Sequence, residues 1–147
     1  MLTNTKIRKA IESDNVTIRR LLETVKLPTE SVEGGTATFF IAELDGSVAG
    51  IAGFEFYGRD ALLRSVAVPP QLQKKGIGEK VVDSMIAIAR KQHFTRIILL
   101  TETAEQLFKR KGFTVVDRAG IHNEALQRST EFTTACPKSA VCMELIL

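Results

Sequence analysis

Residues 62–78, LLRSVAVPPQLQKKGIG, decide the fold, because they join a buried strand to a helix through a short basic loop. A pair of prolines stops the strand, since proline cannot donate to a sheet ladder. Lys74 and Lys75 then precede a helix start at which Gly76 and Gly78 allow a ligand to come close to the backbone. Helix N-termini favour anions through the dipole and the unpaired first amides. The stretch therefore predicts a pyrophosphate-binding loop.

Two common nucleotide-binding motifs do not fit this loop. The dinucleotide pattern GxGxxG fails, because Val81 stands where the third glycine after Gly76 and Gly78 is required. The P-loop pattern GxxxxGK[ST] is absent. What remains is QxxGxG, which begins at Gln73 and directly follows a strand.

Length and composition indicate a globular protein. A chain of 147 residues fits a single domain, 1–147, that buries a sizeable core. Apolar residues make up 44% and charged residues 25% of the chain, which is ordinary for such a domain. The net charge of +3 is modest, and a pI near 9.0 is the only feature that favours nucleic acid. Long Lys/Arg runs are absent and aromatic residues are scarce, so we expect no nucleic-acid partner.

We expect no membrane partner and no metal. The first residues, MLTNTKIRKAIESDN, contain no apolar stretch of the kind found in signal peptides, and no apolar run approaches membrane length. His93 and His122 stand alone, and Cys136 and Cys142 lack a paired metal-type spacing. These features predict a cytoplasmic protein with reduced thiols.

Hydrophobic periodicity and turn residues predict an α/β fold with one mixed sheet covered by helices. Asp45 and Gly46 are typical of a two-residue hairpin turn, and Gly50 and Gly53 indicate a bulge or a close backbone approach. Ser13 and Asp14 are candidate N-caps. We expect strands at 5–10, 39–44, 47–56, 61–68, 96–100, 114–117 and 140–147, and helices at 15–25, 78–92, 104–111 and 123–132, with 28–36 irregular or briefly helical.

The QxxGxG motif after a strand that ends VAVP resembles the pyrophosphate motif of the GNAT superfamily of N-acetyltransferases. A second element, Arg110-Lys111-Gly112-Phe113 after a further strand and short helix, strengthens the resemblance. It implies the GNAT acyltransferase fold, with a mixed, mostly antiparallel sheet flanked by helices. It also implies acetyl-CoA as cofactor and direct transfer of the acetyl group to the amine of a small molecule.

The resemblance also implies roles for individual residues. The backbone of Val66, Ala67 and Val68 would pair with the pantetheine arm, and the N–H of Val66 would polarise the thioester carbonyl as an oxyanion donor. The pyrophosphate would be held by Gln73, Lys74, Lys75, Gly76, Ile77 and Gly78.

The chain departs from the family pattern at two positions. The family often has a Tyr that protonates the departing thiolate, and an Asn after the fifth strand; here these positions hold Phe108 and Thr101. A thiolate whose thiol pKa is near 8.5 can take its proton from water, so Phe108 does not exclude catalysis. We expect Thr101 and Phe108 to lie beside the cofactor. A non-catalytic CoA-binding or sensor module remains the alternative.

An ammonium acceptor must lose a proton, which requires a general base. Glu102 and Glu55 are the favoured candidates and Glu43 is the weakest, although each also fits an ordinary solvated position. Arg64 interrupts an apolar strand, where an unpaired charge is costly. Two interpretations stay open: Arg64 pairs with a carboxylate such as Glu55, or it anchors an anionic substrate group.

The C-terminal third resembles small GNAT proteins encoded with arsenic-resistance genes. The resemblance lies in Glu131-Phe132, Cys136-Pro137-Lys138-Ser139-Ala140 and Met143, together with the LRSV and LLT stretches. It implies an amino-acid-like or arsenical acceptor, for which we expect Arg64 and Phe132 to be substrate-binding residues. Both cysteines fit small buried residues better than an arsenic site. Apolar edge strands near the C-terminus are compatible with a homodimer.

Overall fold

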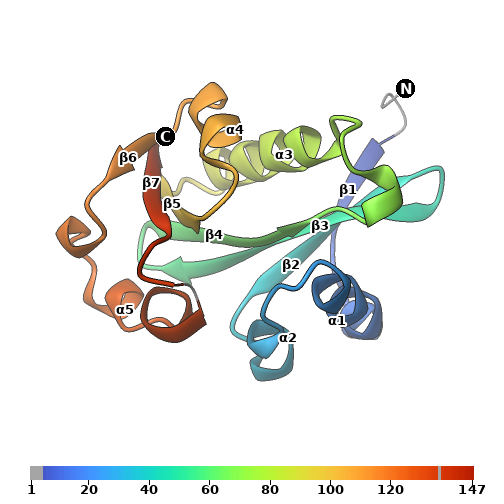
Figure 1. The fold of residues 1–147 in the computed structure, drawn as a ribbon, viewed down its shortest axis with the longest axis horizontal. Helices are drawn as coiled ribbons and strands as arrows, with labels where there is room; N and C mark the ends of the chain where they lie inside the picture. The colour runs from blue at the N-terminus through green and yellow to red at the C-terminus, as the bar shows by residue number, and fades with distance from the viewer. Residues whose placement is uncertain (1–4, 136) are drawn as a thin grey trace. The chain divides into compact units, whose positions relative to one another are not determined.

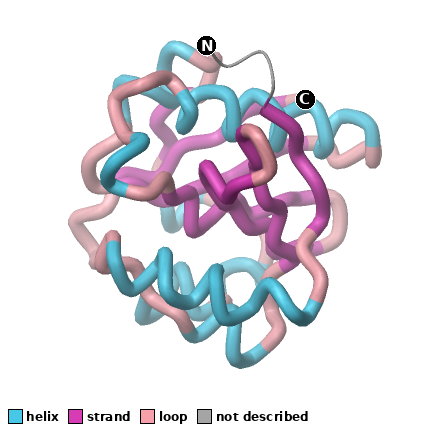
Figure 2. Tube along the Cα trace, turned by 90° about the vertical axis from the view of Figure 1, so that its right-hand side faces the viewer, coloured by secondary structure: helices cyan, strands magenta, loops and turns pink. Residues whose placement is uncertain are grey.

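A computed structural model describes residues 5–135 and 137–147. Among them, seven strands are joined in the order β1-β2-β3-β4-β5-β7-β6, with helices between them along the chain (Figure 1). The strands are β1 (Thr5–Lys9), β2 (Thr38–Leu44), β3 (Ser47–Tyr57), β4 (Asp60–Ala67), β5 (Arg96–Thr101), β6 (Thr114–Val116) and β7 (Val141–Ile146). The α-helices are α1 (Asn15–Thr24), α2 (Glu30–Gly34), α3 (Ile77–Lys91), α4 (Glu105–Arg110) and α5 (Glu124–Gln127). Figure 2 distinguishes helices from strands along the Cα trace.

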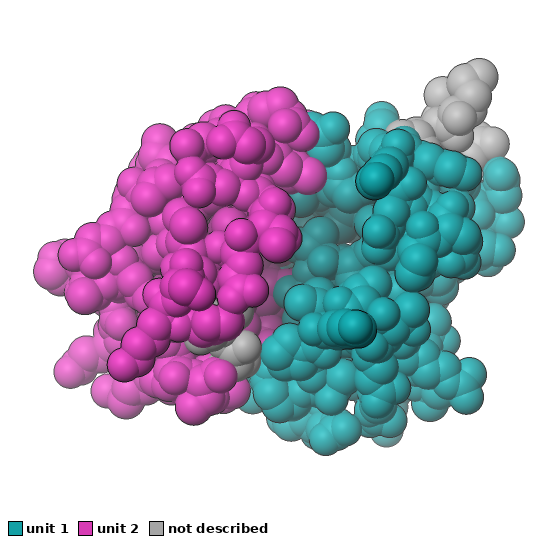
Figure 3. Space-filling model, in the orientation of Figure 1, with its two compact units in different colours: residues 1–55, 65–85 teal, residues 56–64, 86–147 magenta. Residues whose placement is uncertain are grey.

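The predicted fold class is confirmed. The pairs β1–β2, β2–β3, β5–β7 and β6–β7 are antiparallel, and β4–β5 is parallel. Contacts divide the chain into two compact units, residues 1–55 with 65–85 (unit 1) and residues 56–64 with 86–147 (unit 2), which Figure 3 colours separately. One domain over 1–147 stays a prediction. No helix in the described part of the chain combines the length and the apolar character that crossing a bilayer requires.

Unit 1 is built on the β2–β3 hairpin, and its turn is the expected one. Asp45 and Gly46 have φ of 52° and 80°, the positive values that a two-residue turn matched to strand twist requires. The expected close approach at Gly50 is also present: a Cβ there would lie 3.0 Å from Val81 Cγ2 and 3.4 Å from the Ala67 carbonyl oxygen. The core packs α1 and α2 against the strands through Ile18, Leu21, Leu22, Val32, Phe39, Ile41, Ile51 and Ala67.

The start of α1 differs from the prediction. Asp14 occupies the N-cap position but makes no side-chain cap bond there. Its carboxylate instead accepts hydrogen bonds from Arg8 Nη1 and Nη2 at 2.8 and 2.9 Å and from the Ile11 amide at 2.8 Å. These contacts lower the pKa of Asp14 to about 2, chiefly through the Arg8 hydrogen bond. A charge-assisted pair with arginine has displaced the simpler cap.

Unit 2 places β7 between β5 and β6. The helix α4 is closed by Gly112, as predicted, and the φ of this glycine is 98°. Gly112 N donates to Lys109 O and Phe113 N donates to Phe108 O, both at 3.0 Å, which is the Schellman pattern. The rings of Phe108 and Phe113 pack edge to face with centroids 5.4 Å apart, the apolar contact that accompanies this motif.

The expected helix over 123–132 is wrong. The chain forms the short α5, then a break, then a π-helix at Glu131–Ala135. Ser129 explains the break, because its hydroxyl accepts a hydrogen bond from the Phe132 amide at 3.2 Å and so begins a new helical turn. The Thr133 hydroxyl donates to the Ser129 carbonyl at 2.8 Å and reinforces this turn.

A polar network fixes the start of α5 to the strands of unit 2. Buried Asp60 accepts hydrogen bonds from Arg96 Nε at 2.7 Å and Arg96 Nη2 at 3.1 Å. The Asn123 amide nitrogen donates to Asp60 at 2.8 Å and to the Tyr57 carbonyl at 2.9 Å, while its oxygen accepts from Leu126 N at 3.1 Å. Asn123 therefore caps α5 and binds a strand-to-strand turn at the same time.

Candidate functional site

The loop between β4 and α3 has the geometry of an anion-binding loop. After the 3-10 turn Pro70–Leu72, Lys74 has φ of 64° and Gly76 has φ of 80°. Alternation between left-handed and other backbone conformations turns successive N–H groups toward one side. Ile77 then begins α3, whose first amides have no partner within the helix. The loop and the helix start thus present several amides together.

The side chain of Gln73 ties this loop back to the strand. Its amide nitrogen donates to the Val68 carbonyl at 3.0 Å, so the first residue of the QxxGxG motif also has a structural contact. Lys74 and Lys75 follow it and are both exposed. Their ammonium groups are therefore available to balance the charge of an anion beside the helix.

The residues present fit the pyrophosphate of acetyl-CoA. The 15-residue helix α3 is long enough to carry a full macrodipole, whose positive end lies at the loop. A Cβ at Gly78 would stand 3.8 Å from Val68 Cγ2, so the backbone there is covered only by ordinary van der Waals contact. Amides, two cations and a helix N-terminus are the groups that bind diphosphates in proteins.

Strand β4 is distorted before it reaches the loop. Its parallel ladder pairs Asp60–Leu62 with Arg96–Ile98. Ser65 then has φ of 59°, an uncommon conformation for a residue other than glycine and one foreign to a regular strand. Val66, which follows, is half-buried. The backbone therefore changes direction just before the residues expected to meet the pantetheine.

Arg64 forms a buried ion pair with a carboxylate, as one of the two interpretations of the sequence has it, and the partner is Glu131. Its Nη2 lies 3.4 Å from Glu131 Oε1, and the two side chains are 1% and 7% exposed. Glu131 is the first residue of the π-helix and the only charged residue between Ser129 and Pro137. The sequence signal for this partner was that Glu131 is the one charge in an otherwise uncharged stretch.

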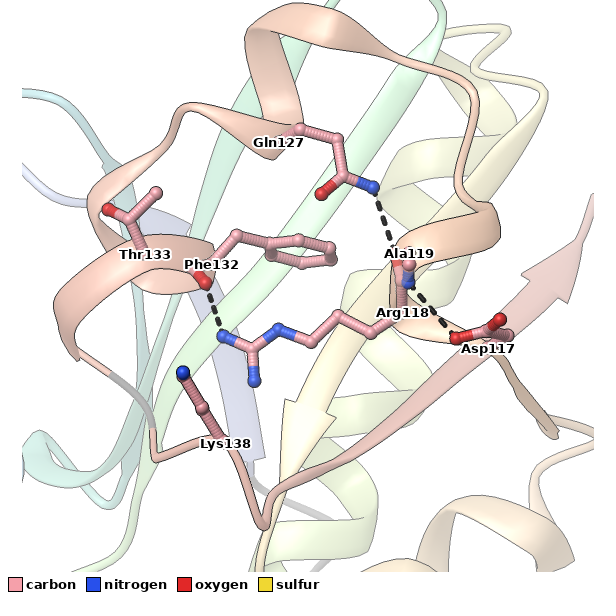
Figure 4. Close-up of a pocket in the computed structure, with 7 residues that line it drawn as sticks. All are labelled: Asp117, Arg118, Ala119, Gln127, Phe132, Thr133 and Lys138. Atoms are coloured by element: carbon pink, nitrogen blue, oxygen red, sulfur yellow. Dashed lines mark hydrogen bonds between the residues drawn. The ribbon is translucent and has the colours of Figure 1, made fainter.

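Arg118 organises a pocket in unit 2, which Figure 4 shows. Its guanidinium donates to the Phe132 carbonyl and to the Pro137 carbonyl, the latter at 3.1 Å. The same guanidinium lies over the Phe132 ring, 5.3 Å from its centroid. The open pocket has a volume of about 360 Å³ and is lined by Asp117, Arg118, Ala119, Gln127, Phe132, Thr133 and Lys138 (Figure 4). Nothing in the local sequence marks Arg118 for this position.

The remaining candidate residues lie in varied settings. Thr101 ends β5, and its hydroxyl accepts a hydrogen bond from the Ala104 amide at 3.0 Å, which helps start α4. Glu102 is exposed, whereas Glu55 on β3 is only 3% exposed. Phe108 is buried against Phe113. The structure thus separates one buried carboxylate from one that faces solvent.

Cys142 is a buried free cysteine, and burial raises the pKa of its thiol to about 11. A thiol with such a pKa is mostly protonated at neutral pH and is a poor nucleophile or metal ligand. Cys136, the other cysteine, lies outside the described residues.

Comparison with known proteins identifies the family. The family model described as Acetyltransferase (GNAT) family matches residues 9–113, which include β4, the loop and α3. The chain belongs to the GNAT family of acetyltransferases. It is accordingly an N-acetyltransferase, and acetyl-CoA is its cofactor.

Individual relatives agree with this family. The chain is 31% identical to an amino-acid acetyltransferase of Mycobacterium tuberculosis over 121 residues, which cover 76% of this chain and 69% of that protein. It is 27% identical to an uncharacterised N-acetyltransferase of Chlorobaculum tepidum, with 98% and 95% of the two chains covered. The structure superimposes with a TM-score of 0.80 on a Mycobacterium tuberculosis protein in complex with CoA and NLQ, at 25% identity and with 97% and 99% covered.

Proposed function

We propose that the protein acetylates the primary amine of a small, amino-acid-like molecule, directly from acetyl-CoA. The observation that carries the proposal is the loop 73–78, where Lys74 and Gly76 at positive φ precede the N-terminus of α3. The similarity to a protein named amino-acid acetyltransferase supports the class of acceptor.

Acetyl-CoA supplies an activated acetyl thioester, and the chain supplies its binding and polarisation. In the proposal the backbone of Val66, Ala67 and Val68 pairs with the pantetheine arm, while Thr101 and Phe108 lie beside it. The N–H of Val66 donates to the thioester oxygen on which negative charge develops. The pyrophosphate contacts come from Gln73, Lys74, Lys75, Gly76, Ile77 and Gly78.

A carboxylate removes the proton that an ammonium acceptor must lose before its nitrogen can attack. Glu55 and Glu102 are the proposed bases, and burial favours Glu55 because it excludes competing water. Phe108 has no proton to return, so the departing thiolate takes one from water. Replacing each glutamate with glutamine and comparing the pH dependence of kcat/KM tests the assignment. The acidic limb disappears only in the variant that lacks the base.

On the acceptor side we propose Phe132 together with Arg64, whose guanidinium would exchange part of its contact with Glu131 for a carboxylate or other oxyanion of the acceptor. The resemblance of the 131–143 region to proteins encoded with arsenic-resistance genes makes an organoarsenical amino acid one acceptor to test. A cytoplasmic location and a homodimer complete the proposal.

Thermal denaturation with and without acetyl-CoA tests the cofactor site. We expect acetyl-CoA to raise the melting temperature of the wild type. The melting temperature of Gly76→Glu should not change on addition of acetyl-CoA, because the new carboxylate would occupy the proposed anion site. Gly46→Glu is the matched control, since Gly46 also has φ of 80° but lies in the hairpin turn with nothing within 4 Å of an added Cβ. No shift of the wild type at millimolar acetyl-CoA contradicts the assignment.

The second candidate is a CoA-binding module without turnover. The packing of Phe108 against Phe113, where the family often has a proton donor, favours it. Release of free thiol from acetyl-CoA separates the two functions, with amines, amino acids and their phosphorus and arsenic analogues offered as acceptors. Tight binding without thiol release on any acceptor would support the module.

A further inference from the structure

We propose that Glu131 is a positioning residue for acetyl transfer. Through its ion pair with Arg64 it fixes the backbone distortion at Ser65, and thereby the direction of the Val66 N–H. The inference rests on the proposed function, in which that N–H polarises the thioester carbonyl.

The distortion at Ser65 needs support from outside the strand. A left-handed conformation is unfavourable for a residue other than glycine or asparagine, because the Cβ comes too close to a backbone carbonyl oxygen. Ser65, with φ of 59°, nevertheless lies between Arg64 and Val66 within β4. Strained residues of this kind persist only where the surrounding structure over-determines them, and they cluster at functional sites. A contact that fixes an adjacent residue adds to such support.

The ion pair supplies such a contact at the preceding residue. Both members are nearly inaccessible to solvent, and Arg64 Nη2 lies 3.4 Å from Glu131 Oε1. Removing one member of a buried ion pair is strongly unfavourable, because burial makes lost charge compensation costly. The position of the Arg64 side chain, and with it one end of the distorted backbone, consequently depends on where Glu131 stands.

Glu131 is itself held in place by the structure around the π-helix. Its neighbour Phe132 donates its amide hydrogen to Ser129 Oγ at 3.2 Å. The Phe132 carbonyl accepts a hydrogen bond from Arg118, and the guanidinium covers the Phe132 ring (Figure 4). A π-helix is rare, and short π-helical turns occur frequently at functional sites. Here the side chain at its first position is the carboxylate that binds Arg64.

The direction of the Val66 N–H can be measured without knowing the acceptor. The carbonyl ¹³C resonance of acetyl-CoA labelled at that carbon moves on binding when a donor polarises the oxygen. We expect a shift in the wild type and at most half of it in Glu131→Gln. Affinity for CoA, which lacks the acetyl group, stays within threefold in isothermal titration, because the loop 73–78 is unaltered. Glu131→Asp keeps the charge and restores part of the shift.

Glu144→Gln is the matched control. It removes a carboxylate 3.1 Å from Arg96 Nη1, another ion pair of unit 2 that is remote from Ser65 along the chain. We expect it to retain the full carbonyl shift. An equal loss of shift in Glu144→Gln and Glu131→Gln would show a general structural effect and would overturn the inference.

A double variant, Arg64→Met with Glu131→Leu, covers the case in which Glu131→Gln does not fold. Replacing both charges with apolar groups of similar volume is often tolerated, so this variant should fold. It should still lose at least half of the carbonyl shift, because the contact that fixes the strand is gone. If either folded variant shows the carbonyl shift of the wild type, the positioning role of Glu131 is overturned and the proposed function is unaffected. Acetyl-CoA binding to the wild type without any carbonyl shift overturns the role of Val66, and the inference with it.

Discussion

The loop at 73–78 and the segment at 117–138 are constructed in opposite ways. The loop is made by backbone: Lys74 and Gly76 at positive φ and a helix start, with one side-chain bond from Gln73. The segment is held by side chains such as Arg118 and Asn123, which, besides the local cap of α5, reach partners 14 to 66 residues away. The proposed cofactor side of this enzyme is therefore encoded locally, and the proposed acceptor side is encoded largely at longer range.

This difference matches the tasks of the two regions. A pyrophosphate is the same ligand in every enzyme that uses acetyl-CoA, and amides with a helix dipole bind it whatever side chains surround them. An acceptor differs from enzyme to enzyme, so its site must be built from side chains that can change. Four experiments test whether the contrast holds.

The largest expected effect is that of Asn123→Ala. It leaves the Tyr57 carbonyl and Asp60 each without one donor and removes the cap of α5, so we expect a loss of about 2–4 kcal/mol in the free energy of unfolding. The matched change in the loop, Gln73→Ala, removes one part-buried hydrogen bond and should cost about 1 kcal/mol or less. Urea denaturation measures both. Equal losses would contradict the contrast.

Arg118→Ala should cost about 2 kcal/mol, because the guanidinium binds two carbonyls and an aromatic ring. Hydrogen exchange should report faster exchange across 131–138 and unchanged exchange across 74–80. Acceleration in both stretches would mean that the loop depends on the acceptor segment after all.

Asp14→Asn tests an intermediate case, a contact made by side chains that is nevertheless local in sequence. The Arg8 hydrogen bond, followed by the Ile11 amide, lowers the pKa of Asp14 from 3.8 to about 2. A lowered pKa stabilises the fold above the unfolded value and loses that effect as the pH falls through the folded value. We expect the variant to be less stable by about 1 kcal/mol at pH 7. The difference in unfolding free energy between the variant and the wild type should shrink as the pH falls and vanish below about pH 2. A constant difference from pH 7 to pH 2 would show that the charge of Asp14 does not stabilise the fold.

The smallest expected effect comes from two variants of Lys74, which distinguish the contribution of its backbone conformation from that of its charge. Lys74→Gly relieves a left-handed conformation and should stabilise the fold by about 0.5–1 kcal/mol, whereas Lys74→Ala should not. Both remove one cation and should weaken CoA binding several-fold at low salt. If Lys74→Gly binds CoA as well as the wild type does, the charge of Lys74 contributes nothing to CoA binding.

The sequence predicted the elements whose signals are local. Asp45-Gly46 predicted the hairpin and Gly112 the end of α4, because few residues adopt positive φ without strain. The glycines and lysines of 73–78 marked the loop before α3, and its role in binding pyrophosphate stays a prediction. Of the fold, the strands and most helices were predicted within a few residues.

The errors and omissions arose where side chains from distant positions compete with local preference. Ser129 breaks the expected helix at 123–132 by capping a new turn, and Arg8 takes Asp14 away from its expected cap. The partner of Arg64 could not be chosen from the sequence, since several carboxylates were plausible and the pairing depends on where the π-helix places Glu131.

The position of β7 has a consequence for folding. It is inserted between β5 and β6, so both of its neighbours are synthesised before it. Until β7 arrives, the apolar strand β5, whose residues Ile97–Leu100 end up buried, has an open edge that can pair with other chains. Unit 2 should therefore complete its sheet late, and slow translation or loss of β7 should favour aggregation over misplacement of the cofactor loop.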